Sequence, residues 1–133
     1  AHRGHVREPL EHISLGIDLT ALSVRRVERP RSPLRFGFAA GFQTHKGIWN
    51  VLDAAASLKR KGCDFELHIW GPKQSEAPLV ERDIQDCVKL RGLYKPQDIW
   101  DVYAEMDVSL MATIWTEAYG RVVQEAAAAG VPT

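Results

Sequence analysis

The feature that most constrains the fold is a repeated alternation of strand-like and helix-like hydrophobic patterns after residue 33. In "LRFGFAAG" apolar residues recur at every second position, and from Ile48 to Leu58 they recur at helical spacing. The cycle returns with "FELHIWG", which is followed by a moderately helical segment at 78–87. It returns once more with "VKLRGLY" and the helical stripe of "PQDIWDVYAEM". Strands and helices are therefore expected to alternate along most of the chain.

The last part of the chain continues this alternation. "DVSLMAT" predicts a buried strand at about 107–113, and a helix is expected at about 118–129 with Gly130 as its C′ residue. Parallel neighbouring strands need a crossover, which is usually helical and right-handed. The pattern therefore predicts an α/β protein with a doubly wound, Rossmann-like parallel sheet, and such sheets bind ligands at the carboxyl ends of their strands.

The pattern also suggests how the chain is organised. Residues 1–33 are rich in Arg, His and Pro and are interpreted as an arm or interdomain linker, and residues 34–133 as the Rossmann-like domain. The closing "GVPT" is typical of the start of a further parallel strand, so we expect a domain truncated at its C-terminal end. A naturally short edge strand would give the same letters. If the strand at 107–113 is left at an edge, self-association through it is expected.

Charge and cysteine content exclude several classes of protein. Seventeen basic residues balance seventeen acidic ones, so there is no global positive field for nucleic acid or an anionic membrane. Cys63 and Cys87 make neither a disulfide framework nor a zinc cluster, and are expected to be buried thiols in a reducing compartment. No run approaches the roughly 18–20 apolar residues that span a bilayer. We therefore expect a cytoplasmic protein without a metal site.

The first candidate site is the loop "AAGFQTHKG" between the first strand and the first helix. Small residues let a ligand approach the backbone, a helix N-terminus favours a phosphate, and Lys46 would add a full positive charge. The glycines Gly37 and Gly41 do not have the spacing of a dinucleotide fingerprint, and the loop lacks the ending of a P-loop. The alternative is that Lys46 is a solvated lysine at a turn.

The second candidate site is the pair Glu117 and Glu125. If a helix begins at residue 118, eight residues at 1.5 Å each separate the two by about 12 Å, too far for a glycosidase acid/base couple. A helical wheel places Glu125 beside the apolar arc rather than facing the core. The alternatives are a surface ion pair of Glu125 with Arg121 and a favourable charge of Glu117 at a helix N-terminus.

Several of these segments together carry a family resemblance. "AAGFQTHKGIWNVLDAA", "HIWG", "RGLY" and "TIWTEAYGRVVQEAAAAGVP" occur in an order and at spacings that resemble the C-terminal, donor-binding half of retaining GT-B glycosyltransferases. That family includes sucrose-phosphate synthase and bacterial cell-envelope sugar transferases. The most specific element is Glu117-x7-Glu125, and the resemblance covers about residues 12–133. It implies transfer of a sugar from a nucleoside-diphosphate sugar to an acceptor sugar, lipid or small molecule, with no further cofactor.

The resemblance also implies roles for individual residues. Lys46 would pair with the donor diphosphate. Glu125 would bridge the two ribose hydroxyls, and Glu117 would face the transferred sugar as the catalytic-site residue. Leu93 would lie against the nucleobase. The backbone around the diphosphate would be supplied by Gly41 and Gln43 in the first loop and by Tyr119 and Gly120 before the last helix.

The sequence departs from the family pattern in ways that keep another function open. The first loop reads Phe42-Gln43-Thr44, without the arginine that many members use as a second diphosphate cation. The acceptor domain is absent, and members of the family transfer sugar in the cleft between their two halves, so we expect this chain alone to be inactive. The alternative is a non-catalytic nucleotide-binding or regulatory module. A nicotinamide-binding domain fits poorly, because the second strand ends in Trp70-Gly71 rather than in an acidic residue.

Overall fold

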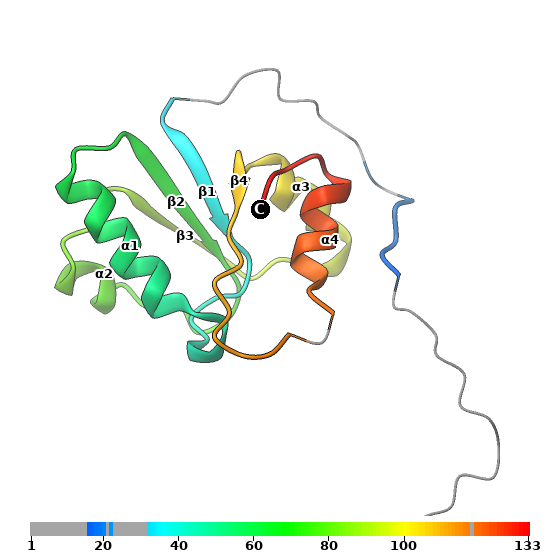
Figure 1. Ribbon diagram of the computed structural model, residues 1–133, viewed down its shortest axis with the longest axis horizontal. Coiled ribbons are helices and arrows are strands. Elements are labelled where there is room, and N and C mark those ends of the chain that lie inside the picture. The colour runs from blue at the N-terminus through cyan, green and yellow to red at the C-terminus, as the bar shows by residue number, and fades with distance from the viewer. Residues whose placement is uncertain (1–15, 21, 23–31, 118) are drawn as a thin grey trace, which may run out of the picture.

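The structure, a computed structural model, describes residues 16–20, 22, 32–117 and 119–133. Four strands form one parallel sheet in the order β3-β2-β1-β4, with helices on both faces (Figure 1). This architecture confirms the predicted α/β class. In chain order the elements are β1 (Leu34–Phe38), η1 (Thr44–Lys46), α1 (Ile48–Arg60), β2 (Phe65–Trp70), α2 (Ala77–Glu81), β3 (Val88–Gly92), η2 (Pro96–Asp98), α3 (Ile99–Ala104), β4 (Val108–Ser109) and α4 (Arg121–Ala128).

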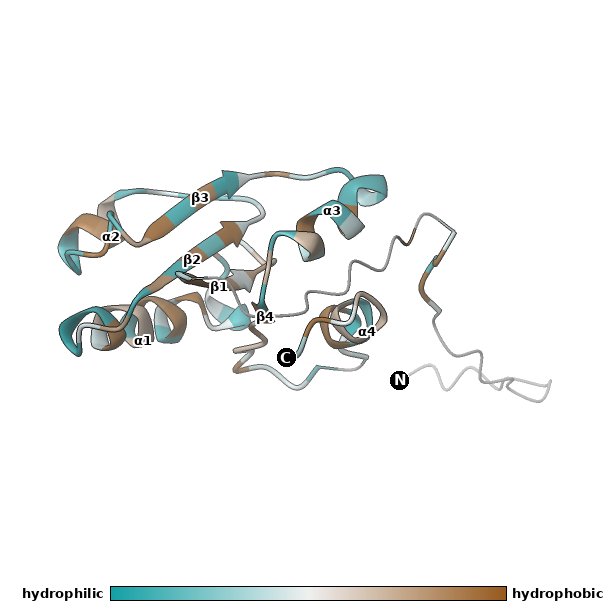
Figure 2. Ribbon diagram, turned by 90° about the horizontal axis from the view of Figure 1, so that it is seen from above, coloured by the Kyte–Doolittle hydropathy of each residue, from teal (hydrophilic) through white to brown (hydrophobic). Residues whose placement is uncertain are grey.

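The two faces of the sheet carry separate hydrophobic clusters. Helices α1 and α2 pack against one face, where Phe38, Leu67 and Ile69 are almost fully buried. Helices α3 and α4 belong to the cluster on the other face, which is built around Trp70, Tyr103 and other buried residues (Figure 2). The arrangement follows from the period-two pattern of the strands, because alternate side chains point to opposite faces. The sheet is therefore doubly wound, as the alternation of elements predicts.

The strand order places β1 between β2 and β4. Its residues pair in parallel with β2 from Leu34 to Phe38, and Phe36 and Gly37 pair with β4. The chain runs outward from β1 through β2 to β3 and then crosses to the opposite side of β1. The topology therefore reverses between β1 and β4, which is the point where open α/β sheets form their ligand crevice.

Three elements differ from their expected bounds. Helix α2 ends at Glu81 rather than near residue 87, and Asp83 follows in the left-handed region at φ 53°. Strand β4 has only two residues, because the chain beyond Ser109 leaves the regular ladder and runs on as a loop. Helix α4 begins at Arg121 because Gly120 precedes it with φ 60° and ψ 49°. The estimate of about 12 Å between Glu117 and Glu125 assumed a helix from residue 118 and does not apply to this geometry.

The described residues near both ends of the chain contact the folded domain. Most of the predicted arm lies outside the described residues, although Ile17 and Leu22 pack against the cluster around α3 and α4. At the other end the N–H of Ser109 donates to the carbonyl of Pro132, 2.8 Å away, so the last residues run beside β4.

Cys63 is exposed and Cys87 half-buried, so the prediction that both are buried was wrong. Within the described residues no helix is both long and apolar enough to cross a membrane.

Candidate functional site

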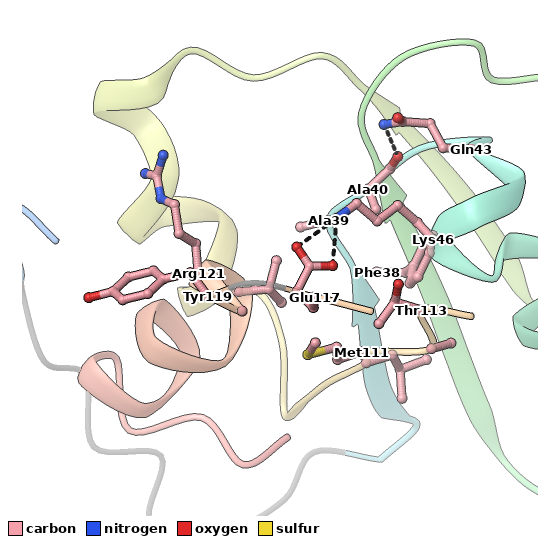
Figure 3. A pocket seen from close by; sticks show the side chains of 14 residues that line it. Phe38, Ala39, Ala40, Gln43, Lys46, Met111, Thr113, Glu117, Tyr119 and Arg121 are labelled. Atoms are coloured by element: carbon pink, nitrogen blue, oxygen red, sulfur yellow. Dashed lines mark hydrogen bonds and ion pairs between the residues drawn. The ribbon is translucent and has the colours of Figure 1, made fainter. Parts of the chain in front are cut away.

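A cavity of about 370 Å³ opens at the carboxyl ends of β1 and β4, where the topology reverses. Its volume lies within the range of small-molecule sites. Two loops and the start of α4 form its walls: the segment after β1, the segment after β4, and residues 119–122 (Figure 3). The lining residues are Phe38, Ala39, Ala40, Gln43, Lys46, Leu110, Met111, Ala112, Thr113, Glu117, Tyr119, Gly120, Arg121 and Val122.

Two residues proposed from the sequence, Lys46 and Glu117, meet in this cavity. The Lys46 Nζ donates to both carboxylate oxygens of Glu117 at 3.0 and 2.9 Å, although the residues are 71 positions apart in the chain. Figure 3 shows the two side chains pointing toward each other. Each is about one-third exposed, with side-chain values of 32% and 28%. Both side chains are therefore accessible to a ligand, although each already has the other as its hydrogen-bond partner.

The backbone of residues 45–47 holds the segment with Lys46 against the segment that leads to Glu117. The carbonyl of His45 accepts hydrogen bonds from the Thr113 hydroxyl and from the N–H of Ile114, both at 3.1 Å. Gly47 has φ 81°, and a Cβ built on it would lie 1.8 Å from the Ala112 carbonyl oxygen. Only glycine tolerates both the left-handed conformation and so close a backbone neighbour. Gly47 thus fixes the segment before Glu117 against the start of α1.

The loop after β1 is held by backbone contacts with the loop after β2. Gly41 has φ 60°, its N–H donates to the Trp70 carbonyl at 2.7 Å, and a Cβ on it would lie 2.3 Å from the Pro72 oxygen. The Gln43 side-chain amide donates to the Ala40 carbonyl at 2.8 Å. Gln43 lines the cavity, whereas Gly41 is not among its lining residues. The structure therefore shows Gly41 shaping the loop, and its predicted contact with a diphosphate stays a prediction.

Glu125 lies in the second turn of α4 and is only 8% exposed. Its Oε1 accepts from Arg121 Nη2 at 3.0 Å, and its Oε2 is 3.1 Å from the Tyr103 hydroxyl. The prediction that Glu125 merely flanks the core was wrong. A carboxylate can be buried when it is paired and hydrogen-bonded, and α3 supplies the buried hydroxyl that the helical wheel could not reveal.

Glu125 also lines two further cavities, which share Arg121 with the cavity at Lys46. They have volumes of about 310 and 380 Å³ and share Pro96, Ile99, Arg121 and Glu125 as lining residues. Tyr94 lines the smaller of these two cavities. Burial raises the pKa of its hydroxyl, and the Glu125 carboxylate raises that pKa further. Burial likewise raises the pKa of Tyr103 far above its ordinary value, with the same carboxylate adding to the effect. Both tyrosines are therefore neutral hydrogen-bonding groups at neutral pH.

The remaining predicted residues are divided between the cavity and the surface. Tyr119 and Gly120 line the cavity beside Lys46, while residue 118 lies outside the described residues. Leu93 is 77% exposed and follows Gly92 at the end of β3. Its proposed contact with a base stays a prediction. Among the described residues there is no group of three or more His, Cys, Asp or Glu side chains that could hold a metal ion.

Comparison with known proteins identifies the family. Residues 23–133 match the family described as Glycosyl transferases group 1. The chain belongs to this family. Two curated relatives of this glycosyltransferase family are the amylovoran biosynthesis glycosyltransferase AmsK of Erwinia amylovora, 30% identical over 137 residues, and the putative colanic acid biosynthesis glycosyltransferase WcaL of Escherichia coli K12, 26% identical over 139 residues. They align with 93% and 97% of this chain, which spans about a third of their own length, 33% and 34%.

Solved glycosyltransferase structures share the fold of this chain. A sucrose-phosphate synthase from Thermosynechococcus elongatus has a TM-score of 0.71 at 21% identity, covering 88% of this chain and 32% of its own. The pneumococcal O-GlcNAc transferase GtfA, solved with UDP and GlcNAc, has a TM-score of 0.66 at 20% identity, covering 84% and 22%. The C-terminal domain of the glycosyl transferase group 1 protein LpcC of Francisella tularensis has a TM-score of 0.65 at 15% identity, covering 87% and 68%. These likenesses confirm the expected GT-B architecture.

For three residues of this glycosyltransferase chain, the sequence predicted a smaller role than the structure shows. Arg121 was weighed only as a surface partner of Glu125, yet it lines all three cavities. Tyr103 was counted only as a member of an apolar stripe, and Gly47 was read as part of "HKG" without a structural role. The lysine-glycine order at the start of a helix was the available signal for Gly47. No pattern within α3 could have revealed the contact of Tyr103 with α4.

Proposed function

We propose that residues 34–133 bind the nucleoside-diphosphate sugar donor of a retaining glycosyltransferase, which transfers the sugar to an acceptor. The observation that carries this proposal is that two neighbouring cavities with charged linings share Arg121. Lys46, Glu117 and Arg121 line the cavity at the switch point, and Arg121 and Glu125 line the second one. A donor has groups for both: the sugar and diphosphate for the first cavity and the ribose for the second.

The chemistry of each position fits one part of such a ligand. Lys46 offers a full positive charge to the diphosphate, and the start of α4 at Gly120 and Arg121 adds backbone N–H groups and the positive end of the helix dipole. Glu117 accepts hydrogen bonds from the hydroxyls of the transferred sugar. Glu125 accepts from the ribose hydroxyls, which a carboxylate can do because each of its oxygens has two lone pairs.

The comparisons support this proposal at the level of fold and family. The structural relative GtfA was solved with UDP and GlcNAc, and AmsK and WcaL are named for amylovoran and colanic acid biosynthesis. We extend nucleotide-sugar binding to this chain because its cavity lies at the switch point where open α/β sheets bind ligands. By itself the chain is expected to bind nucleotide without transferring sugar, since the acceptor would be held by another part of the parent enzyme. The retaining course would show in the anomeric configuration of the parent enzyme's product by NMR.

The alternative is a nucleotide-binding module without catalysis, which the loop Phe42-Gln43-Thr44 favours because it lacks a second cation. Both functions require the nucleotide site. They differ in whether the hexose contributes to binding. In a live donor site Glu117→Gln should affect the nucleotide sugar differently from the plain nucleotide, whereas in a regulatory module it should change the two affinities equally.

The test of the nucleotide site is titration calorimetry with UDP, GDP and ADP, followed by the 2′-deoxy analogue of the tightest ligand. Glu125→Gln should weaken the ribonucleotide by about 1.5–3 kcal/mol, the scale of a hydrogen bond to a charged group, and the deoxynucleotide by much less. The exposed Glu81→Gln on α2 is the matched control and should change neither. If Glu125→Gln keeps the wild-type ratio of the two affinities, the carboxylate does not bind ribose and the proposal fails.

A further inference from the structure

The two oxygens of Glu125 are held in physically different ways. The Tyr103 hydroxyl next to Oε2 belongs to a side chain that is 0% exposed, whereas the Arg121 side chain at Oε1 is 66% exposed. One partner is fixed in the core between α3 and α4, and the other is a long side chain largely in solvent. Oε2 is thus permanently occupied by the protein, and Oε1 is occupied by a group that can leave.

From this asymmetry we infer that Tyr103 is a positioning residue for Glu125 and that Arg121 is a placeholder which the ligand displaces. The inference rests on the proposed function, because it assigns the oxygens of the same ribose site. A nucleotide would take the place of the Arg121 guanidinium at Oε1, and the Tyr103 hydroxyl would keep the carboxylate plane fixed while it does so.

The geometry around the Tyr103 hydroxyl supports the positioning role. The hydroxyl oxygen lies 3.1 Å from Glu125 Oε2 and 3.1 Å from the carbonyl oxygen of Val122. A phenol has one hydrogen to donate, so the carbonyl and the carboxylate share it. Both acceptors lie on α4, about one turn apart. A single buried hydroxyl on α3 therefore fixes the position of α4 relative to α3 as well as the position of the carboxylate. Loss of the hydroxyl leaves Glu125 free to follow Arg121 toward solvent.

The placement of Arg121 supports the placeholder role. Its side chain lines the cavity with Lys46 and also the two cavities next to Glu125, so it stands where these spaces join. A ligand that reaches from Lys46 to Glu125 must pass this point. The Arg121 guanidinium can leave Oε1 because its own side chain is 66% exposed, so water solvates it once the ligand hydroxyls take its place.

The experiment measures the affinity of the tightest of UDP, GDP and ADP, and of its 2′-deoxy analogue, for wild type, Tyr103→Phe and Arg121→Leu. Tyr103→Phe should lower the ratio of ribo to deoxy affinity about three- to tenfold, as expected for one hydrogen bond. Arg121→Leu should tighten the ribonucleotide about two- to fivefold, because the competing cation is gone, and should keep a ribo preference at least as large as that of wild type.

Two control variants separate these effects from general damage. Val102→Ala, on the same helix and buried in the same cluster, should lower the melting temperature without changing the ratio. Lys59→Met removes one positive charge at the far end of α1, where Lys59 pairs with Asp83 and Asp86, and should leave the affinity unchanged. The ratio is the readout that a merely structural role for Tyr103 would not move.

The outcomes are distinguishable from those of the donor-site test. If Glu125→Gln lowers the ribo preference while Tyr103→Phe keeps it, the ribose site stands and the positioning role is overturned. If Arg121→Leu weakens the nucleotide instead of tightening it, Arg121 is a direct ligand contact and the placeholder role is overturned. If wild type binds none of the three nucleotides, the proposed function fails and this inference fails with it.

Discussion

The ion pair between Lys46 and Glu117 leads to a prediction about nucleotide affinity. Glu117→Gln should bind a nucleoside diphosphate more tightly than wild type, because the carboxylate that occupies Lys46 is replaced by a neutral amide. At 2.9 Å two unit charges interact by roughly 1.4 kcal/mol in bulk water and roughly 6 kcal/mol at an effective dielectric constant of 20. Both side chains are about one-third exposed, so the contribution that double-mutant cycles give for such pairs, about 0.2–1 kcal/mol, is the better guide.

That contribution corresponds to a gain of about 1.4- to fivefold in affinity for UDP, GDP or ADP, whichever binds most tightly. Isothermal titration calorimetry on wild type, Glu117→Gln, Lys46→Met and the double variant completes a double-mutant cycle. Lys46→Met should weaken the diphosphate at low salt, with a smaller loss at high salt, because exposed charges are screened over about 8–10 Å. In the Lys46→Met background Glu117→Gln should bring no gain, because no freed lysine is left.

The cycle also shows what would refute the reasoning. If the gain from Glu117→Gln persists without Lys46, the carboxylate acts only as a negative charge near the phosphates and the two residues do not compete. If Glu117→Gln weakens the plain diphosphate, the glutamate contacts that part of the ligand directly. The corresponding nucleotide sugar is the companion ligand, because Glu117→Gln should lose part of its gain there if the glutamate also holds the hexose.

Two further predictions concern the scaffold. Gly47→Ala should destabilise the domain by more than about 2 kcal/mol, since it adds left-handed strain to a 1.8 Å approach of the Ala112 oxygen, and thermal unfolding should show a large drop relative to Gly62→Ala, where φ is 71° but the space is open. The hydrogen bond from His68 lowers the pKa of Glu66 below its ordinary value of 4.5, so its stabilisation is present above that value and is lost as the pH falls through the lowered pKa. Urea unfolding between pH 5 and about pH 2 should therefore show a shallower loss of stability for Glu66→Gln than for wild type, and equal slopes would contradict the lowered pKa of Glu66.

The fold was largely predictable because its signals are local. The period-two pattern of Phe36 and Phe38 and the helical spacing from Ile48 onward each depend on a few neighbouring residues. The end of α2 was less predictable, because the sequence around Asp83 continues an amphipathic pattern although its backbone adopts a left-handed conformation. Local patterns thus gave the order and type of the elements better than their ends.

The candidate site was less predictable than the fold, because its contacts join distant parts of the chain. Lys46, Glu117 and Glu125 could be selected from their residue types and spacing, but their partners could not. The pairing of Lys46 with Glu117 depends on β4 lying beside β1, and the burial of Glu125 depends on the approach of Tyr103 from another helix. A helical wheel assigns faces from one helix alone, so it places a carboxylate outside the core even where a neighbouring helix brings it a donor.

The position of β4 next to β1 has a consequence for how ligand binding would be seen in folding experiments. Lys46 and Glu117 meet only after the chain has completed β2, β3 and α3 and returned to the opposite edge of β1. No local part of the chain contains both walls of the crevice, so a partly folded species that lacks the β1–β4 contact has no complete pocket. A bound nucleotide therefore stabilises only the fully assembled sheet. Amide hydrogen exchange should slow together in β1, β4 and α4 when ligand is added, while openings that leave the β1–β4 contact intact keep their original rates.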